Sequence, residues 1–225
     1  MIRAGSGQPP GPARSLRRRG WKQAPFAALD FESTGLDFER DSIVSYGVVP
    51  VDGGRIVVGG ASYQEVAPDV APSRRSITVH ELRPADLAGA PPVAEALGPL
   101  GRALEGRFLL TWSAGVEVSF LSGLFGGARR SWYRRTVDVM RLAMALERSE
   151  PYRQATGDFR LAAVAARYGV PADDPHHALG DALMTAGLFL VLATKLEARG
   201  YRTVRHLLRQ TVPPRRRPGT GFAGA

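Results

Sequence analysis

The chain alternates short apolar runs with longer amphipathic segments, between two ends rich in glycine, proline and arginine. The runs 26–32, 43–51 and 55–66 are dense in β-branched and aromatic residues, which favours three strands. Asp52-Gly53-Gly54 separates the second run from the third and is typical of a hairpin turn. Pro50 lacks an N–H for a sheet ladder, so we expect it at an edge position or a bulge near that turn.

The remaining pattern predicts helices and one more strand. Residues 67–92 are proline-rich and predict at most short helical turns. We expect a fourth strand over Phe108–Trp112 and helices over 93–104, 116–125, 137–147, 159–168 and 178–198, with a short basic helix over 201–210. Strands first, followed by strand–helix alternation, predict one α/β or α+β domain with a mixed sheet.

Composition narrows the class of protein. The 225 residues are enough for one domain with small appendages, and 44% of them are hydrophobic, as in globular proteins. No apolar run approaches the roughly 20 residues of a membrane span, and the basic start leads into no apolar signal region. We therefore expect no membrane association and a cytoplasmic location. With no cysteine present, a metal would be held by carboxylates and histidines.

The net charge of +9 is concentrated at the ends of the chain. Residues 1–22 contain six basic residues and no acid, residues 199–225 contain seven arginines and no acid, and residues 23–198 carry a net charge of −4. We expect a basic flexible arm over 1–22, a folded domain over 23–198 and a basic helix and tail over 199–225. These ends either contact nucleic acid or are solubilising tails of an arginine-rich protein.

Two carboxylates stand on the first predicted strand. Asp30 and Glu32 are two residues apart, so both side chains project from the same face. Two carboxylates on an apolar strand are costly to bury in a core and are well suited to bind a cation. The solvated face of an edge strand would give the same pattern. Ser33 and Thr34 follow with Gly35, which allows close backbone approach.

Further candidates lie at the starts of two predicted helices. Asp181 falls in the first turns of the long helix 178–198, with His176 five residues before it and Pro175 at the helix entrance. Such an acid can equally be a partner of the helix dipole, whereas the histidine offers a base of near-neutral pKa. Glu117 begins the helix after Trp112 and, by itself, reads more simply as a helix-start acid.

Taken together, these residues resemble the DEDD-type 3′–5′ exonucleases of the histidine subclass, the group of the polymerase III epsilon subunit, ribonuclease T and oligoribonuclease. The sequence LDFESTGL at 29–36 resembles the first motif of that family, and the spacing from His176 to Asp181 resembles the third. Connecting segments also agree: VVPVDGGRI at 48–56, TVDVMRL at 136–142 and LAAVAARYGVP at 161–171. The second motif departs from the family, because WSAGVEVSFL at 112–121 has Glu117 where the family has Asp and Val116 where it has Phe.

The resemblance implies a ribonuclease H-like fold, an α/β mixed sheet flanked by helices, and a two-metal site for Mg²⁺ or Mn²⁺. It implies that Asp30, Glu32, Glu117 and Asp181 hold the metals and that His176 is the general base. It further implies that the backbone and hydroxyls of Ser33 and Thr34 hold the 3′ terminus of the substrate and that Leu36 wedges against its terminal base.

The expected substrate is the 3′ end of a single strand, DNA more than RNA, and a DNA polymerase is a candidate partner. A binding or interaction domain that has lost catalysis through the altered second motif is the alternative of another class. An unrelated metal-dependent phosphoesterase is a third.

Overall fold

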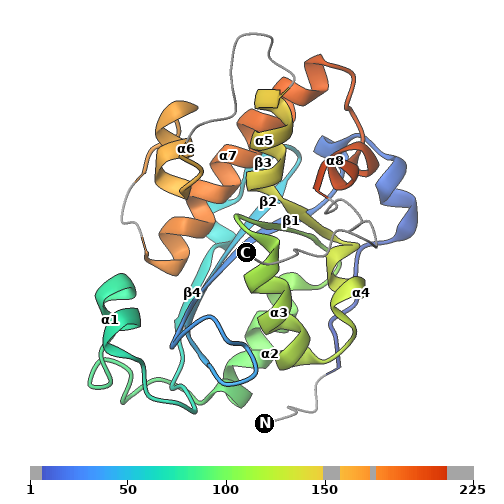
Figure 1. Cartoon of the computed structure of the whole chain (residues 1–225). Coiled ribbons are helices and arrows are strands. Elements are labelled where there is room, and N and C mark those ends of the chain that lie inside the picture. The colour runs from blue at the N-terminus through green and yellow to red at the C-terminus, as the bar shows by residue number, and fades with distance from the viewer. Residues whose placement is uncertain (1–6, 149–157, 173–175, 212–225) are drawn as a thin grey trace, which may run out of the picture.

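The computed structural model describes residues 7–148, 158–172 and 176–211. Its centre is a mixed sheet of order β3-β2-β1-β5-β6, in which β4 also pairs with β2 (Figure 1). β1 is antiparallel to β2 and parallel to β5, which is parallel to β6. The strands are β1 (Phe26–Ser33), β2 (Ile43–Asp52), β3 (Arg55–Ile56), β4 (Ser62–Glu65), β5 (Phe108–Thr111) and β6 (Thr136–Asp138).

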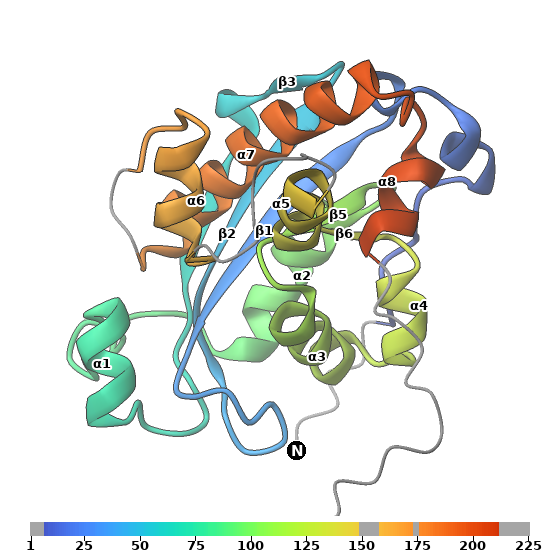
Figure 2. The same ribbon diagram turned by 45° about the horizontal axis from the view of Figure 1, so that its top comes forward.

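Helices cover both faces of this sheet, as Figure 2 shows. The described helices are α1 (Arg74–His80), α2 (Val93–Leu104), α3 (Ala114–Phe125), α4 (Arg129–Tyr133), α5 (Val139–Arg148), α6 (Leu161–Arg167), α7 (Ala178–Ala198) and α8 (Val204–Thr211). Short 3₁₀ helices are η1 (Arg14–Arg18), η2 (Trp21–Gln23) and η3 (Val58–Gly60). The α/β architecture expected from the sequence is thus confirmed.

The alternation of side chains along β1 divides the core in two. Phe26 and Ala28 belong to the cluster formed with α5, α6, α7 and α8, whereas Leu29 and Phe31 belong to the cluster formed with α2 and α3. Because side chains alternate along a strand, Asp30 and Glu32 continue the row of Phe26 and Ala28. Both carboxylates therefore lie on the face of the sheet that α7 covers.

α7 is long and apolar enough, by composition, to cross a membrane. In the fold it packs across β1 and β2 and against α5 and α6. Phe189 and Leu192 are fully buried there, in the first of the two core clusters. The apolar composition of α7 is accounted for by this position in the core.

Several sequence predictions needed correction. The expected helix 137–147 begins only at Val139, because Thr136–Asp138 pairs with β5 as a short parallel strand. The third run, 55–66, is split into β3, η3 and β4. Pro50 lies on β2 between the residues that pair with β3 and β4, where its missing N–H interrupts no ladder, and its carbonyl accepts from Val57 N at 2.9 Å. α4 was not expected.

The N-terminal segment also differs from the flexible arm that we expected over residues 1–22. From residue 7 onward the segment packs on the domain, and Trp21 is 2% exposed, with its ring 5.6 Å edge-on from Phe189. The buried indole supplies the apolar contact that composition alone did not reveal. Residues 1–6, Pro175 and the tail 212–225 lie outside the described residues. The short basic helix expected at the other end is α8, at Val204–Thr211.

Candidate active site

Three carboxylates meet where β1 ends and α7 begins. Asp30, Glu32 and Asp181 each offer an oxygen within 4.8 Å of the other two. The first two share one face of β1, and the third lies in the first turn of α7, which crosses that face. Hard oxygen ligands at this spacing are suited to a divalent cation such as Mg²⁺ or Mn²⁺.

The protonation of the cluster reflects its burial. Burial raises the pKa of Asp30 well above its ordinary value, and the neighbouring charges of Glu117, Glu32 and Asp181 raise it further. Burial and the charge of Asp181 raise the pKa of Glu32 to about 8. In a poorly solvated space, the ionised forms of carboxylates that repel one another are unfavourable unless protons or cations neutralise them.

Glu117 lies on α3 beside this cluster, outside the set of three that converges most tightly. Its side chain is 5% exposed, and its Oε2 has no hydrogen-bond partner among the described residues. Burial is the main cause that raises the pKa of Glu117 to about 8, and the charge of Asp138 adds to it. A buried carboxylate oxygen without a partner among the described residues, near the charges of Asp30 and Asp138, fits a cation or its water as the missing neighbour.

A glycine sets the position of α7. Gly47 pairs with Asp30 in the β1–β2 register. A Cβ atom on Gly47 would collide with the backbone of Ala178 and Leu179 in the first turn of α7. The first turn can therefore lie directly on the sheet, which brings Asp181 beside Asp30.

The loop after β1 fixes its own hydroxyls. Thr34 is 2% exposed; its Oγ1 donates to Asp41 Oδ1 at 2.9 Å and accepts from Ser42 N at 3.1 Å. Ser33 Oγ donates to the carbonyl of Gly35 at 2.6 Å. A Cβ on Gly35 would collide with the Asp41 carboxylate, so this loop does require the close approach that glycine allows. Leu36, at 77% exposed, is free to contact another molecule.

The two histidines occupy different environments. His176 is exposed with φ 65°, directly before α7, and forms no ion pair with a carboxylate of the described residues. His177 is the N-cap residue of α7, and its ring stacks on Tyr63 with centroids 4.4 Å apart. The structure thus brings together the predicted carboxylates, whereas His176 is exposed, two residues before α7.

The structure also shows a residue that sequence reasoning missed. Asp138, 5% exposed at the end of β6, accepts from Ala114 N at 3.2 Å and from Arg141 N at 2.9 Å. The Asp138 carboxylate therefore links the first residue of α3 to the start of α5. Ala114, its contact on α3, lies about one helical turn before Glu117. Its place within the segment TVDVMRL was the available signal, but nothing local distinguished it from a helix residue.

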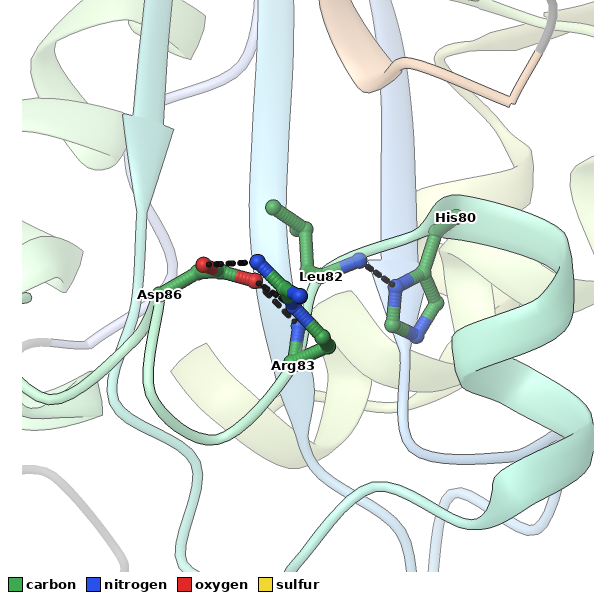
Figure 3. Close-up of polar contacts among 4 residues, drawn as sticks. All are labelled: His80, Leu82, Arg83 and Asp86. Atoms are coloured by element: carbon green, nitrogen blue, oxygen red, sulfur yellow. Dashed lines mark hydrogen bonds and ion pairs between the residues drawn. The ribbon is translucent and has the colours of Figure 1, made fainter.

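His80 is a second such residue, at the end of α1 (Figure 3). Its Nδ1 accepts from Leu82 N at 3.1 Å, and its Nε2 has no partner among the described residues. Burial is the main cause that lowers the pKa of His80. Arg83 and Asp86 close the following turn with a two-contact ion pair at 3.0 and 3.1 Å. A lone histidine in a proline-rich stretch gave no sequence signal.

The chain is similar in sequence to segments of known proteins. The chain is 29% identical over 177 residues to DNA polymerase III PolC-type of Thermotoga petrophila, covering 76% of the chain and 12% of that protein. It is 30% identical over 181 residues to a DNA polymerase III subunit epsilon-like protein of Rhodobacter capsulatus, covering 79% of the chain and 25% of that protein. It thus spans only a small part of the PolC relative.

Among solved structures, E. coli Exonuclease I in complex with a dT13 oligonucleotide has a similar fold. The TM-score is 0.66 at 15% identity, over 79% of this chain and 43% of that one. The family model described as "Exonuclease" (RNase_T) matches residues 27–189, which include all four carboxylates and both histidines of the site. The chain therefore belongs to this exonuclease family.

Proposed function

We propose that the chain is a divalent-metal-dependent 3′–5′ exonuclease that releases nucleoside monophosphates one at a time from the 3′ end of single-stranded DNA. Family membership supports hydrolysis of a nucleic acid. The observation that carries the rest is the convergence of Asp30, Glu32 and Asp181 within 4.8 Å, with the buried Glu117 beside them. DNA is favoured because the fold resembles an exonuclease bound to an oligodeoxynucleotide, and a DNA polymerase is a partner suggested by the relatives.

We assign the metal ligands from these contacts. Asp30, Glu32 and Asp181 would hold one Mg²⁺ or Mn²⁺, and Asp30 with Glu117 would hold a second. Bound cations lower the pKa of water and stabilise the charge that builds on a phosphodiester during cleavage. The raised pKa values of the metal-free cluster support this assignment, because a cation would supply the positive charge that the site lacks.

The remaining roles belong to residues around the cluster. His176 would accept the proton of the attacking water, a role that requires the short segment before α7 to bring its ring inward. Leu36 would pack against the terminal base, since it is the exposed apolar side chain of the loop after β1. Ser33 and Thr34 would hold the 3′ hydroxyl through backbone groups other than the Thr34 N–H, because the Thr34 hydroxyl is bonded to Asp41 and the Thr34 N–H to the carbonyl of Ser42.

Polarity and metal dependence are tested by digestion of single-stranded DNA and RNA of one sequence, each labelled at its 5′ end. The proposal expects a ladder of 5′-labelled products that shorten by one nucleotide, in Mg²⁺ or Mn²⁺ and not in EDTA. Release of the labelled terminal nucleotide as the first product would contradict the polarity. Binding of the strand without any product would favour a domain that binds nucleic acid and has lost catalysis.

A further inference from the structure

Three arginines surround a cavity on the side of the molecule where η1 meets the end of α4. Arg14, Arg17 and Arg134 line this cavity, which has a volume of about 430 Å³. Arg14 and Arg134 are exposed, and Arg17 is half-buried. We call these three residues the arginine pocket.

The pocket is held in shape by the N-terminal segment. Gln8 Oε1 accepts from Ser131 Oγ at 2.8 Å, and Arg135 Nη1 donates to the carbonyls of Pro9 and Pro10 at 3.3 and 3.2 Å. Arg17 Nη2 donates to the carbonyl of Arg134 at 2.6 Å. These bonds hold Arg14 and Arg17 beside Arg134 before any ligand binds, which lowers the entropic cost of binding.

The charge of the pocket is not compensated by its own segments. Residues 7–20 and 126–137 contain no acidic residue. Burial lowers the pKa of Arg17, and the charges of Arg134 and Arg14 lower it further. Three guanidinium groups that repel one another favour an anion between them, and the guanidinium fork matches phosphate oxygens in geometry.

α4 connects this pocket to the active-site loop. Arg134 follows the last residue of α4, and Arg129, at its first residue, lies with its guanidinium 3.8 Å from the ring centre of Phe38. Phe38 belongs to the loop between β1 and β2 that also carries Leu36. Arg129 and Arg130 are exposed, so basic side chains continue from the pocket to the edge of the active site.

The sheet gives the separation of the two sites. Thr136, two residues after Arg134, pairs with Leu109 of β5, and Leu109 pairs with Ala27 of β1. Thr136 therefore marks the amino ends of the parallel strands. Asp30 and Glu32 lie near the carboxyl end of β1. At about 3.3 Å per strand residue the two sites are roughly 20 Å apart, a distance that a single strand needs several nucleotides to span.

We propose that the arginine pocket binds backbone phosphates of the substrate strand several nucleotides on the 5′ side of the scissile bond. The inference rests on the proposed function, which places the 3′ end of the strand at the carboxylate cluster. The continuous basic surface along α4 favours one strand that reaches both sites over a separate acidic protein at the pocket.

The experiment compares Arg14→Ala/Arg134→Ala with a control of equal charge, Arg55→Ala/Arg148→Ala, whose arginines are exposed on β3 and at the end of α5. Arg17 is kept because it bonds to backbone. Binding of a 15-nucleotide strand is measured by fluorescence anisotropy in EDTA between 50 and 200 mM salt. Hydrolysis of a trinucleotide with Mg²⁺ is measured in parallel.

Each phosphate contact on a single strand contributes about 0.7 to the salt slope of binding. Affinity falls as the salt rises from 50 to 200 mM. Because two contacts are lost, this fall should be about sevenfold smaller in the double variant than in the wild type and in the control. Trinucleotide hydrolysis should be unchanged, because a trinucleotide cannot reach the pocket.

The inference would be overturned if the double variant kept the salt slope of the wild type. This holds even if the variant no longer binds a polyglutamate peptide, a result that would instead indicate an acidic protein at the pocket. Failure of the proposed function would look different, since the wild type itself would then not hydrolyse the trinucleotide.

Discussion

Glu117 and Glu32 are buried acids whose state depends on pH. Both have a pKa of about 8 in the fold, mainly because of burial, against about 4.5 in an unfolded chain. The folded state therefore binds more protons between pH 4.5 and pH 8, and the free energy of unfolding of the metal-free protein should fall as the pH rises through this window. The limiting slope is about 1.4 kcal/mol per pH unit for each group.

Denaturant unfolding in EDTA at pH 5, 6, 7 and 8 measures this slope. Glu117→Gln should flatten it and make the protein more stable at pH 8, whereas Glu105→Gln, an exposed acid after α2, should leave it unchanged. Added Mg²⁺ should stabilise the wild type most at pH 8, because it binds the folded, ionised cluster. A flat profile from pH 5 to pH 8 in the wild type would contradict the burial of these acids.

The two histidines before α7 should differ in catalysis. His176→Gln should lower turnover by about 10² to 10⁴, the usual loss of a general base, and leave strand binding intact. His177→Gln keeps a polar side chain but loses the stack on Tyr63, so we expect a small loss of thermal stability and little loss of rate. Rates at saturating substrate for both variants decide the matter, and the opposite ranking would move the general base to His177.

At the scale of elements, the packing of α7 on β2 sets the geometry of the site. Gly47→Ala would force the first turn of α7 away from the sheet, since the new Cβ collides with backbone. A displacement near 1 Å can cost about 100-fold in rate, and overpacking costs about 1–3 kcal/mol in stability. Turnover and thermal unfolding should both reveal this.

Gly59→Ala is the matched control. Gly59 lies in η3, between β3 and β4, and nothing lies within 4 Å of the position that its Cβ would take. It should behave as the wild type. Equal activity of the two glycine variants would show that α7 has room to move without consequence for the cluster.

Elements with a long periodic or apolar pattern could be predicted from the sequence, and short elements defined by their neighbours could not. β1, α2 and α7 have the predicted bounds to within one residue. β6 is three residues long and exists because β5 offers a parallel partner, so its apolar residues were read as the start of a helix. The five residues of α4 carry too little periodicity to be seen.

The same distinction holds for the site. Asp30 and Glu32 follow from strand alternation, which is local. Asp181 and Glu117 join them only through packing across more than 80 residues of sequence, and the family resemblance, not their spacing, pointed to them. Asp138 acts through backbone contacts that no side-chain pattern encodes.

In the whole molecule, the carboxylate cluster and the arginine pocket lie toward opposite ends of the sheet. The carboxyl end of β1 carries the acids, and the amino end of β6 carries the arginine pocket, with α4 between the pocket and the active-site loop. Opposite charges at the two ends would orient a strand, with its 3′ end at the cluster once cations neutralise the acids.

The most direct test of the central claim is the single-turnover rate at which Asp30→Asn releases the 3′-terminal nucleotide of a single strand in Mg²⁺. Asp30 is the ligand shared by both proposed metals, so the rate should fall by about 10³-fold or more, corresponding to several kcal/mol of lost stabilisation. The metal-free variant should unfold at the same temperature as the wild type or higher, because a repelling charge has been removed. A rate within a few-fold of that of the wild type would contradict the assignment of the carboxylate cluster as the catalytic metal site.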